Sequence, residues 1–123
     1  MFENSSEETA YHKLLILYIL YKIKMDLTNS QITQVVLETE MMNYFSLQQL
    51  LSQLMESKFL KIYKDSDKEY YCLTQKGLET LESLMLKIPI DSANKVDHYI
   101  KLNKESLLAE TQVKSSFVKQ SEN

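Results

Sequence analysis

The stretch SLQQLLSQLMESKFLKIYKDSDKEYYCLTQKGLETL, residues 46–81, decides the fold of this chain. Its first part predicts a helix over about 46–57, because four leucines recur at the spacing of one apolar stripe: Leu47, Leu50, Leu51 and Leu54. Two runs of alternating polar and apolar residues follow, at 60–64 and 69–73, and they predict strands. The polar residues 65–68 between them predict a hairpin loop that pairs Lys64 with Glu69 and Tyr63 with Tyr70.

The order helix, strand, turn, strand, helix is that of a winged helix-turn-helix. In that fold one helix enters the major groove of DNA, and the hairpin, called the wing, lies against the phosphates. The lone Gly and lone Pro argue against an all-β fold. We therefore predict a mainly α fold with a small β-hairpin, a winged helix-turn-helix plus a C-terminal helix. The expected organisation is a winged-helix domain over 1–90, a helix over 91–113 and a polar tail over 114–123.

The charge of the chain is unevenly distributed. The net charge is −3, and all 14 basic residues are Lys. Residues 58–76 are net basic, with 5 Lys against 3 acidic residues, whereas residues 1–57 and 77–123 are net acidic. Arg makes the commonest specific contact to guanine, so its absence removes that form of sequence readout. A local basic patch can still bind phosphates.

The first predicted helix, from about Glu8 to Lys24, is apolar on nearly every face between residues 14 and 21. Such a helix must be covered all round, and either a central core position or a dimer contact satisfies this requirement. The covering element is a partner chain or the C-terminal helix, which has an apolar stripe of its own. We expect a homodimer whose contacts come from both helices, through Leu14, Leu17, Tyr18, Tyr21, Val96, Tyr99, Ile100 and Leu107.

The second predicted helix follows a break at residues 25–28, with Thr28, Asn29 or Ser30 as its cap. Tyr44 and Phe45 precede Ser46, which we take as the cap of the next helix. Their position favours core plugs over base-stacking groups. Similarly, Tyr63 and Tyr70 are interpreted as a cross-strand aromatic pair on the outer face of the hairpin with Lys61, the alternative being a contact with the DNA backbone or a partner.

Residues 71–81, YCLTQKGLETL, resemble the end of the wing in PadR-like winged-helix regulators, with the pattern Tyr-x-Leu-Thr-x-x-Gly-x-x-x-Leu. Thr74 can end the strand and cap the next helix. Gly77, the only glycine, lies in the first turn of that helix, where we infer close packing. Residues 29–34, NSQITQ, and 43–49, NYFSLQQ, are similar to the domain-of-unknown-function family 4364, whose members carry a PadR-like winged helix. The resemblance covers about residues 4–113. It implies a C-terminal helix that pairs protomers and, in most members, a further C-terminal segment.

Several function classes lack support in the sequence. His12, His98 and the single Cys72 have no catalytic or metal-ligand spacing, so we expect neither an enzyme, a metal nor a cofactor. The longest apolar run, 14–21, is far below the ~18 residues that a membrane helix needs. The polar, acidic start is unlike a signal peptide. We expect a cytoplasmic protein without membrane contact.

The leading hypothesis is a dimeric transcriptional regulator that binds double-stranded DNA. The helix would contact DNA through Ser46, Gln48, Gln49, Ser52 and Gln53, and the wing would hold phosphates through Lys61, Lys64 and Lys68. Because Gln suits the edge of adenine, an A·T-rich site would fit. The alternative is a winged helix used as a protein-interaction or assembly module, which the acidic balance and the apolar first helix favour. The sequence defines no operator, target gene or small-molecule effector.

Overall fold

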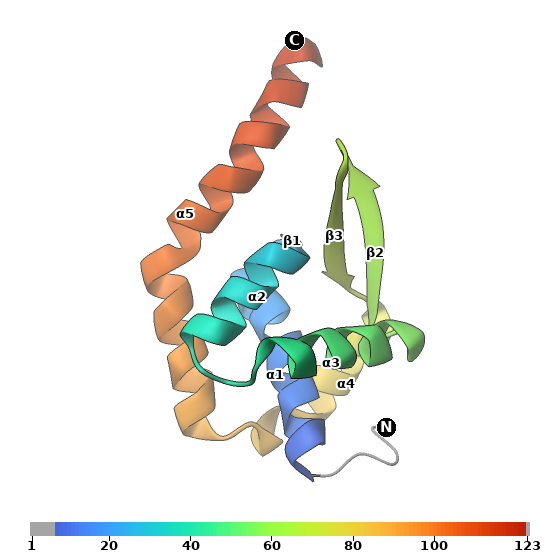
Figure 1. The fold of residues 1–123 in the computed structure, drawn as a ribbon, viewed down its shortest axis with the longest axis vertical. Helices are drawn as coiled ribbons and strands as arrows, with labels where there is room; N and C mark the ends of the chain where they lie inside the picture. The colour runs from blue at the N-terminus through green and yellow to red at the C-terminus, as the bar shows by residue number, and fades with distance from the viewer. Residues whose placement is uncertain (1–6, 123) are drawn as a thin grey trace.

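A computed structural model describes residues 7–122 of the chain, with side chains described for residues 7–110. Helices and a small sheet alternate in the order of a winged helix-turn-helix followed by a long C-terminal helix (Figure 1). The predicted fold class is therefore confirmed. The elements are α1 Glu7–Ile23, β1 Leu27–Thr28, α2 Asn29–Glu38, α3 Tyr44–Glu56, β2 Leu60–Asp65, β3 Lys68–Leu73, α4 Gln75–Leu84, a 3₁₀ turn η1 Met85–Lys87 and α5 Ile90–Glu122.

Helix α1 forms the centre of the core. Every residue from Lys13 to Leu20 is buried, as the apolar run predicts for a helix covered all round. Helices α4 and α5 and strand β3 pack against it. The hydroxyl of Tyr18 donates a hydrogen bond of 2.8 Å to Asp97 of α5. Of the two elements that the sequence offered as a cover for α1, a partner chain or the C-terminal helix, α5 of the same chain therefore covers at least part of it.

Most residues expected at a dimer contact lie inside the chain instead. Tyr21 is 36 % exposed, but the other seven are at most 8 % exposed. The interpretation of these side chains as surface left open for a partner is therefore wrong, because the α1–α5 contact and the core already bury them. The corrected residues are Leu14, Leu17, Tyr18, Val96, Tyr99, Ile100 and Leu107.

This burial predicts that substitutions along α5 change stability rather than association. Ile100→Val removes one buried methylene, so it should lower the free energy of unfolding by about 0.5–1.5 kcal/mol. Leu102→Val, at a position that is 67 % exposed on the same helix, is the matched control and should change little. Chemical denaturation and sedimentation measure the two properties. A change in sedimentation without a change in unfolding would place Ile100 at an intermolecular contact.

The cap of helix α2 is Thr28, one of the three residues that the sequence predicted for it. The Thr28 hydroxyl accepts a hydrogen bond from the Gln31 amide nitrogen at 3.2 Å, and the Gln31 side-chain oxygen accepts one from the Thr28 nitrogen at 3.0 Å. This reciprocal capping box satisfies two donors that the helix cannot pair internally. The buried Gln31 side chain also donates to Glu110 of α5 at 3.0 Å. One residue thus fixes the start of α2 against α5.

The sheet has three antiparallel strands in the order β1–β3–β2. The pairs Lys64–Glu69 and Tyr63–Tyr70 confirm the predicted register. The loop is shorter than expected, because Asp65 and Lys68 pair as well and leave a two-residue turn. Both turn residues have positive φ, 51° at Ser66 and 74° at Asp67, the geometry that matches the twist of a hairpin. Strand β1, Leu27–Thr28, was not predicted.

The end of the wing confirms the inferred close packing at Gly77. A Cβ built on Gly77 would lie 2.2 Å from the carbonyl oxygen of Phe59, closer than any real contact. Thr74 is the cap of α4, since its hydroxyl accepts a hydrogen bond of 2.9 Å from the Gly77 nitrogen. Its hydroxyl also donates to the carbonyl oxygen of Lys58 at 2.7 Å. The start of α4 is therefore fixed against the segment that leads into β2.

The C-terminal helix is longer than the predicted 91–113. Helix α5 follows Pro89, begins at Ile90 and continues to Glu122. Its last turns extend past the rest of the molecule (Figure 1). Side chains after Glu110, and residues 1–6 and 123, lie outside the described residues.

Candidate nucleic-acid interface

The helix predicted to enter the groove, α3, is capped three residues earlier than predicted. Asn43 is the cap, and its side-chain oxygen accepts a hydrogen bond of 2.8 Å from the Ser46 nitrogen. The prediction of Ser46 as cap is therefore wrong. Asn43 and Ser46 are both residue types that cap helices well, so the sequence did not separate them. Ser46 lies within the first turn and is half-buried.

Helix α3 has a clear outward face, opposite the four leucines that bury its inner side. The exposed residues that recur at spacings of three and four along it are Phe45, Gln49, Ser52 and Glu56, which we call the outward stripe. Gln49 and Ser52 thus lie where the sequence predicts contact-making residues. Gln53 is half-buried beside the stripe, where it lines a cleft of about 410 Å³ between α3 and the start of α1.

Gln48 does not belong to the outward stripe. Its side-chain oxygen accepts a hydrogen bond of 2.7 Å from Asn29, and its side-chain nitrogen donates to the Asn29 oxygen at 3.1 Å. Asn29 also donates to the Tyr71 hydroxyl at 3.2 Å. The prediction that Gln48 contacts the DNA groove is therefore wrong. Its side-chain amide instead binds Asn29 at the start of α2, and Asn29 in turn binds Tyr71 of the sheet.

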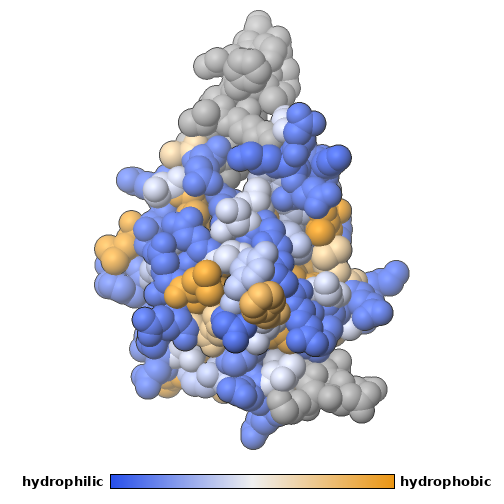
Figure 2. All heavy atoms as spheres, in the orientation of Figure 1, coloured by the Kyte–Doolittle hydropathy of each residue, from blue (hydrophilic) through white to orange (hydrophobic). Residues whose placement is uncertain are grey.

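Tyr44 and Phe45 are on the surface rather than in the core. The Phe45 side chain is 81 % exposed, and that of Tyr44 is 48 % exposed. Their rings meet edge to face, with centroids 5.8 Å apart and planes at 79°. The core-plug prediction is wrong, because a helix that begins at Tyr44 keeps the phase of its leucines and turns Phe45 away from them. Hydrophobic residues are also exposed in the middle of the face on which α2 and α3 lie (Figure 2).

The three predicted wing lysines are exposed, but they do not share one face of the hairpin. Because side chains alternate along a strand, Lys61 lies on the face of Tyr63, and Lys64 on the face of Ile62. Lys64 and Lys68 line a groove of about 450 Å³ with Thr28, Asn29 and Ser30, at the start of α2. Among the described residues, none of the three lysines forms an ion pair. Their charges are therefore directed to solvent.

The base of the wing is tied to the rest of the domain by tyrosines. The Tyr63 hydroxyl donates a hydrogen bond of 2.6 Å to Asp26. The pKa of Tyr63 is raised, mainly by burial and in addition by this hydrogen bond. The ring of Tyr63 stacks on that of Tyr70, with centroids 5.6 Å apart. This pairing confirms the predicted cross-strand contact. Tyr70, however, is 5 % exposed, so it is covered rather than on the outer face.

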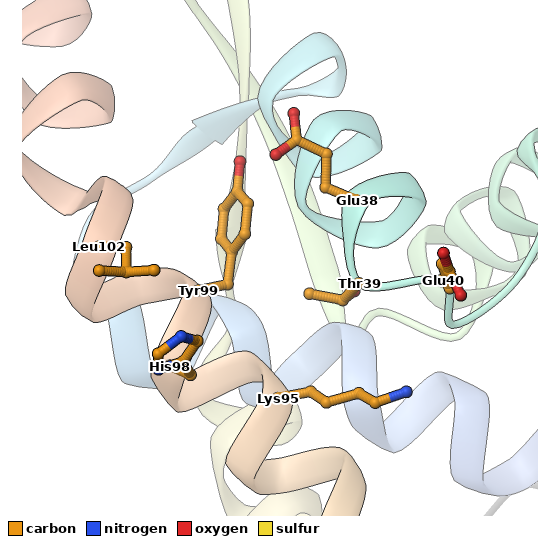
Figure 3. Close-up of a pocket in the computed structure, with 7 residues that line it drawn as sticks. All are labelled: Glu38, Thr39, Glu40, Lys95, His98, Tyr99 and Leu102. Carbon is orange, nitrogen blue, oxygen red and sulfur yellow. The ribbon is translucent and has the colours of Figure 1, made fainter.

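A further pocket, of about 310 Å³, lies between the end of α2 and α5 (Figure 3). The Tyr99 ring lines it, and the Tyr99 hydroxyl finds no hydrogen-bond partner within the described part of the chain, although Gln34 and Glu38 lie near it. Burial and the charge of Glu38 raise the pKa of Tyr99. Since this hydroxyl has less than 1 Å² of accessible surface, a molecule in the pocket would not reach it. The Tyr99 hydroxyl, the buried side-chain polar atom left without a partner among the described residues, therefore could not fix a ligand there.

Metal-ligating side chains are not clustered in the described part of the chain, and its cysteine thiol is half-buried. Among those residues, no group of three or more His, Cys, Asp and Glu side chains is placed to hold a metal ion. Cys72 is half-buried, and burial is the main cause that raises the pKa of its thiol. A raised pKa leaves less of the reactive thiolate. None of the helices within residues 7–122 has the length and hydropathy to cross a membrane.

The fold and the α3–wing surface define a winged helix-turn-helix protein of the mainly α class. The chain belongs to the DUF4364 family: the family described as domain of unknown function (DUF4364) matches residues 12–123. This confirms the resemblance of residues 29–34 and 43–49 to that family. Comparison with curated proteins and with solved structures found no match.

Proposed function

We propose that this protein is a DNA-binding transcriptional regulator of the winged-helix, PadR-like type. The observation that carries the proposal is the outward stripe of α3, which presents Gln49 and Ser52 to solvent beside a wing with exposed lysines. Neither polar side chain has a role in the core. Side chains on such a helix face can read base edges, while lysines on a hairpin can hold the backbone.

The groove between the wing and α2 supports this proposal from the phosphate side. It brings Lys64 and Lys68 to the start of α2, where the backbone amides of a helix end carry partial positive charge. A phosphate on this side would meet two lysines and a helix N-terminus. Asp67 and Glu69 also line the groove, and their charges would weaken the attraction. We therefore expect modest affinity with a marked dependence on salt.

The regulator is proposed to act as a homodimer on an A·T-rich site. Gln49 would pair with adenine, and two α3 helices would lie about one DNA turn apart, ~34 Å. The dimer contact would use surface other than the seven buried residues of α1 and α5. The proposal includes no cofactor, no metal and no enzymatic role, and it places the protein in the cytoplasm.

A second candidate is a winged helix that binds protein rather than DNA. The observation in its favour is the group of exposed apolar side chains around the α2–α3 turn, Leu37, Tyr44 and Phe45. The net charge of −3 also disfavours non-specific DNA binding. In this alternative, neither α3 nor the wing would contact DNA.

The test begins with the binding of mixed genomic DNA over a salt series that starts at ~50 mM, where phosphate contacts are strong. Gln49→Ala should leave the salt dependence unchanged and weaken the preferred site by about 1–3 kcal/mol. Gln53→Ala, next to the stripe, should cost less, because the Gln53 side chain is half-buried whereas that of Gln49 is exposed, although both line the cleft beside α1. A parent protein that shifts no DNA at ~50 mM salt would rule out the regulator in favour of the interaction module.

A further inference from the structure

Phe45 is the most exposed large apolar side chain of α3, and it contributes nothing to the core. It is 81 % exposed, while the leucines of the same helix are at most 7 % exposed. Leaving a phenylalanine in water forgoes the stabilisation that its burial would contribute. Its described ring contact is with Tyr44, whose ring supports it edge to face. The side chain is therefore held outward by its neighbour and by the phase of the helix.

Phe45 lies at the N-terminal end of α3, the end whose residues contact bases in helix-turn-helix proteins. It is the second residue of the helix, and N-terminal residues of recognition helices contact base edges. Gln49 follows four residues later on the same outward stripe. At a rise of about 1.5 Å per residue these positions are about 6 Å apart along the axis, close to two steps of about 3.4 Å in DNA.

We propose that Phe45 is a specificity-determining residue that packs against the C5-methyl group of a thymine in the major groove. Among the bases of DNA, only thymine presents a methyl group there, and phenylalanine is a residue type that makes this contact. The thymine lies within about two base pairs of the adenine that Gln49 reads. Phe45 and Gln49 together then select A·T pairs through two independent chemistries, an apolar contact and an amide pair. This inference rests on the proposed DNA-binding function.

The occupant of this apolar position is DNA rather than another protein for two reasons on the same surface. The polar residues Gln49 and Ser52 continue the stripe beyond Phe45, so the apolar area at this end of α3 is Phe45 with the adjoining Tyr44 ring rather than a continuous apolar groove. The wing lysines Lys64 and Lys68 are exposed and form no ion pair with any described residue, and their charge complements a phosphate backbone. A basic protein segment would instead meet the lysines as like charges.

The experiment uses the A·T-rich duplex that the parent binds best and replaces its thymines by uracil one at a time, which removes only the methyl group. Binding of each duplex is measured for the parent and for Phe45→Ala. For the parent, one substitution should weaken binding about fourfold, the equivalent of one buried methyl group. Phe45→Ala should bind the thymine duplex roughly five- to tenfold more weakly than the parent does, and the same uracil should cost it nothing further. Its salt dependence and melting temperature should equal those of the parent, because the ring contacts neither phosphate nor core.

Leu86→Ala is the matched control, since Leu86 is fully exposed on η1, away from α3. It removes a comparable exposed apolar side chain and should change neither binding nor its response to uracil. If the parent binds DNA but no uracil distinguishes it from Phe45→Ala, the thymine contact is wrong while the regulator stands. Equal weakening on all sequences would also overturn the contact, because a phosphate or folding effect would then explain it. If the parent binds no DNA, the proposed function and the contact fail together.

Discussion

Replacing Gly77 by valine should lower the melting temperature of the domain by about 3–18 °C. The added Cβ would stand 2.2 Å from the carbonyl oxygen of Phe59 and 3.0 Å from the Leu73 side chain. Overpacking of this kind costs about 1–3 kcal/mol, and each kcal/mol shifts the melting temperature of a domain of this size by roughly 3–6 °C. The better helix propensity of valine returns only a few tenths of a kcal/mol. The clash therefore decides the sign.

The neighbouring backbone has little freedom to relieve this clash. The Phe59 carbonyl oxygen already accepts hydrogen bonds from the Thr74 nitrogen at 3.2 Å and from the Thr74 hydroxyl at 3.1 Å. Moving it would strain the cap of α4 and the start of β2 at once. Ser83→Val, at an exposed position of the same helix, controls for the general effect of valine. Thermal unfolding of both variants is the measurement, and equal melting temperatures would show that the region adjusts without cost.

Local patterns in the sequence predicted the elements well because each pattern has a short physical range. The leucine spacing of residues 47–54 placed the buried face of α3, and alternation placed the register of the hairpin. The solitary glycine indicated close packing before any contact was known. In contrast, β1 has only two residues, too few for a period, and it exists because it pairs with Tyr70 and Tyr71 on β3.

The errors in the candidate site come from choices that depend on distant or competing contacts. Two good caps, Asn43 and Ser46, lie three residues apart, and choosing the second assigned Phe45 to the core. The pairing of Gln48 with Asn29 joins two helices and has no local signal. The covering of α1 by α5 joins Tyr18 to Asp97, 79 positions away along the chain. Apolar composition showed that α1 needs covering, but it did not identify the element that covers it.

Changing the wing lysines to glutamine should flatten the salt dependence of DNA binding. Removing one phosphate contact lowers the slope of log affinity against log salt concentration by about 0.9, so the triple variant of Lys61, Lys64 and Lys68 should reduce it by at most ~2.7. The affinity should fall by a similar factor on all DNA sequences, since phosphates carry no base identity. Lys87→Gln combined with Lys101→Gln removes exposed charges away from α3 and the wing, and is the control.

The geometry of the hairpin divides this effect unequally among the three lysines. Lys64 and Lys68 line the groove beside the start of α2, so the double variant should reduce the slope by up to ~1.8. Lys61 shares a strand face with Lys68, but it lies across from Cys72 near the base of the wing and does not line the groove. Its single variant should therefore change the slope least. An equal reduction from all three, or the same reduction in the Lys87 and Lys101 control, would show that overall charge rather than the wing sets the affinity. A reduction confined to Lys64 and Lys68 would mean that a phosphate lies between the wing tip and the start of α2, in the groove that these two lysines line.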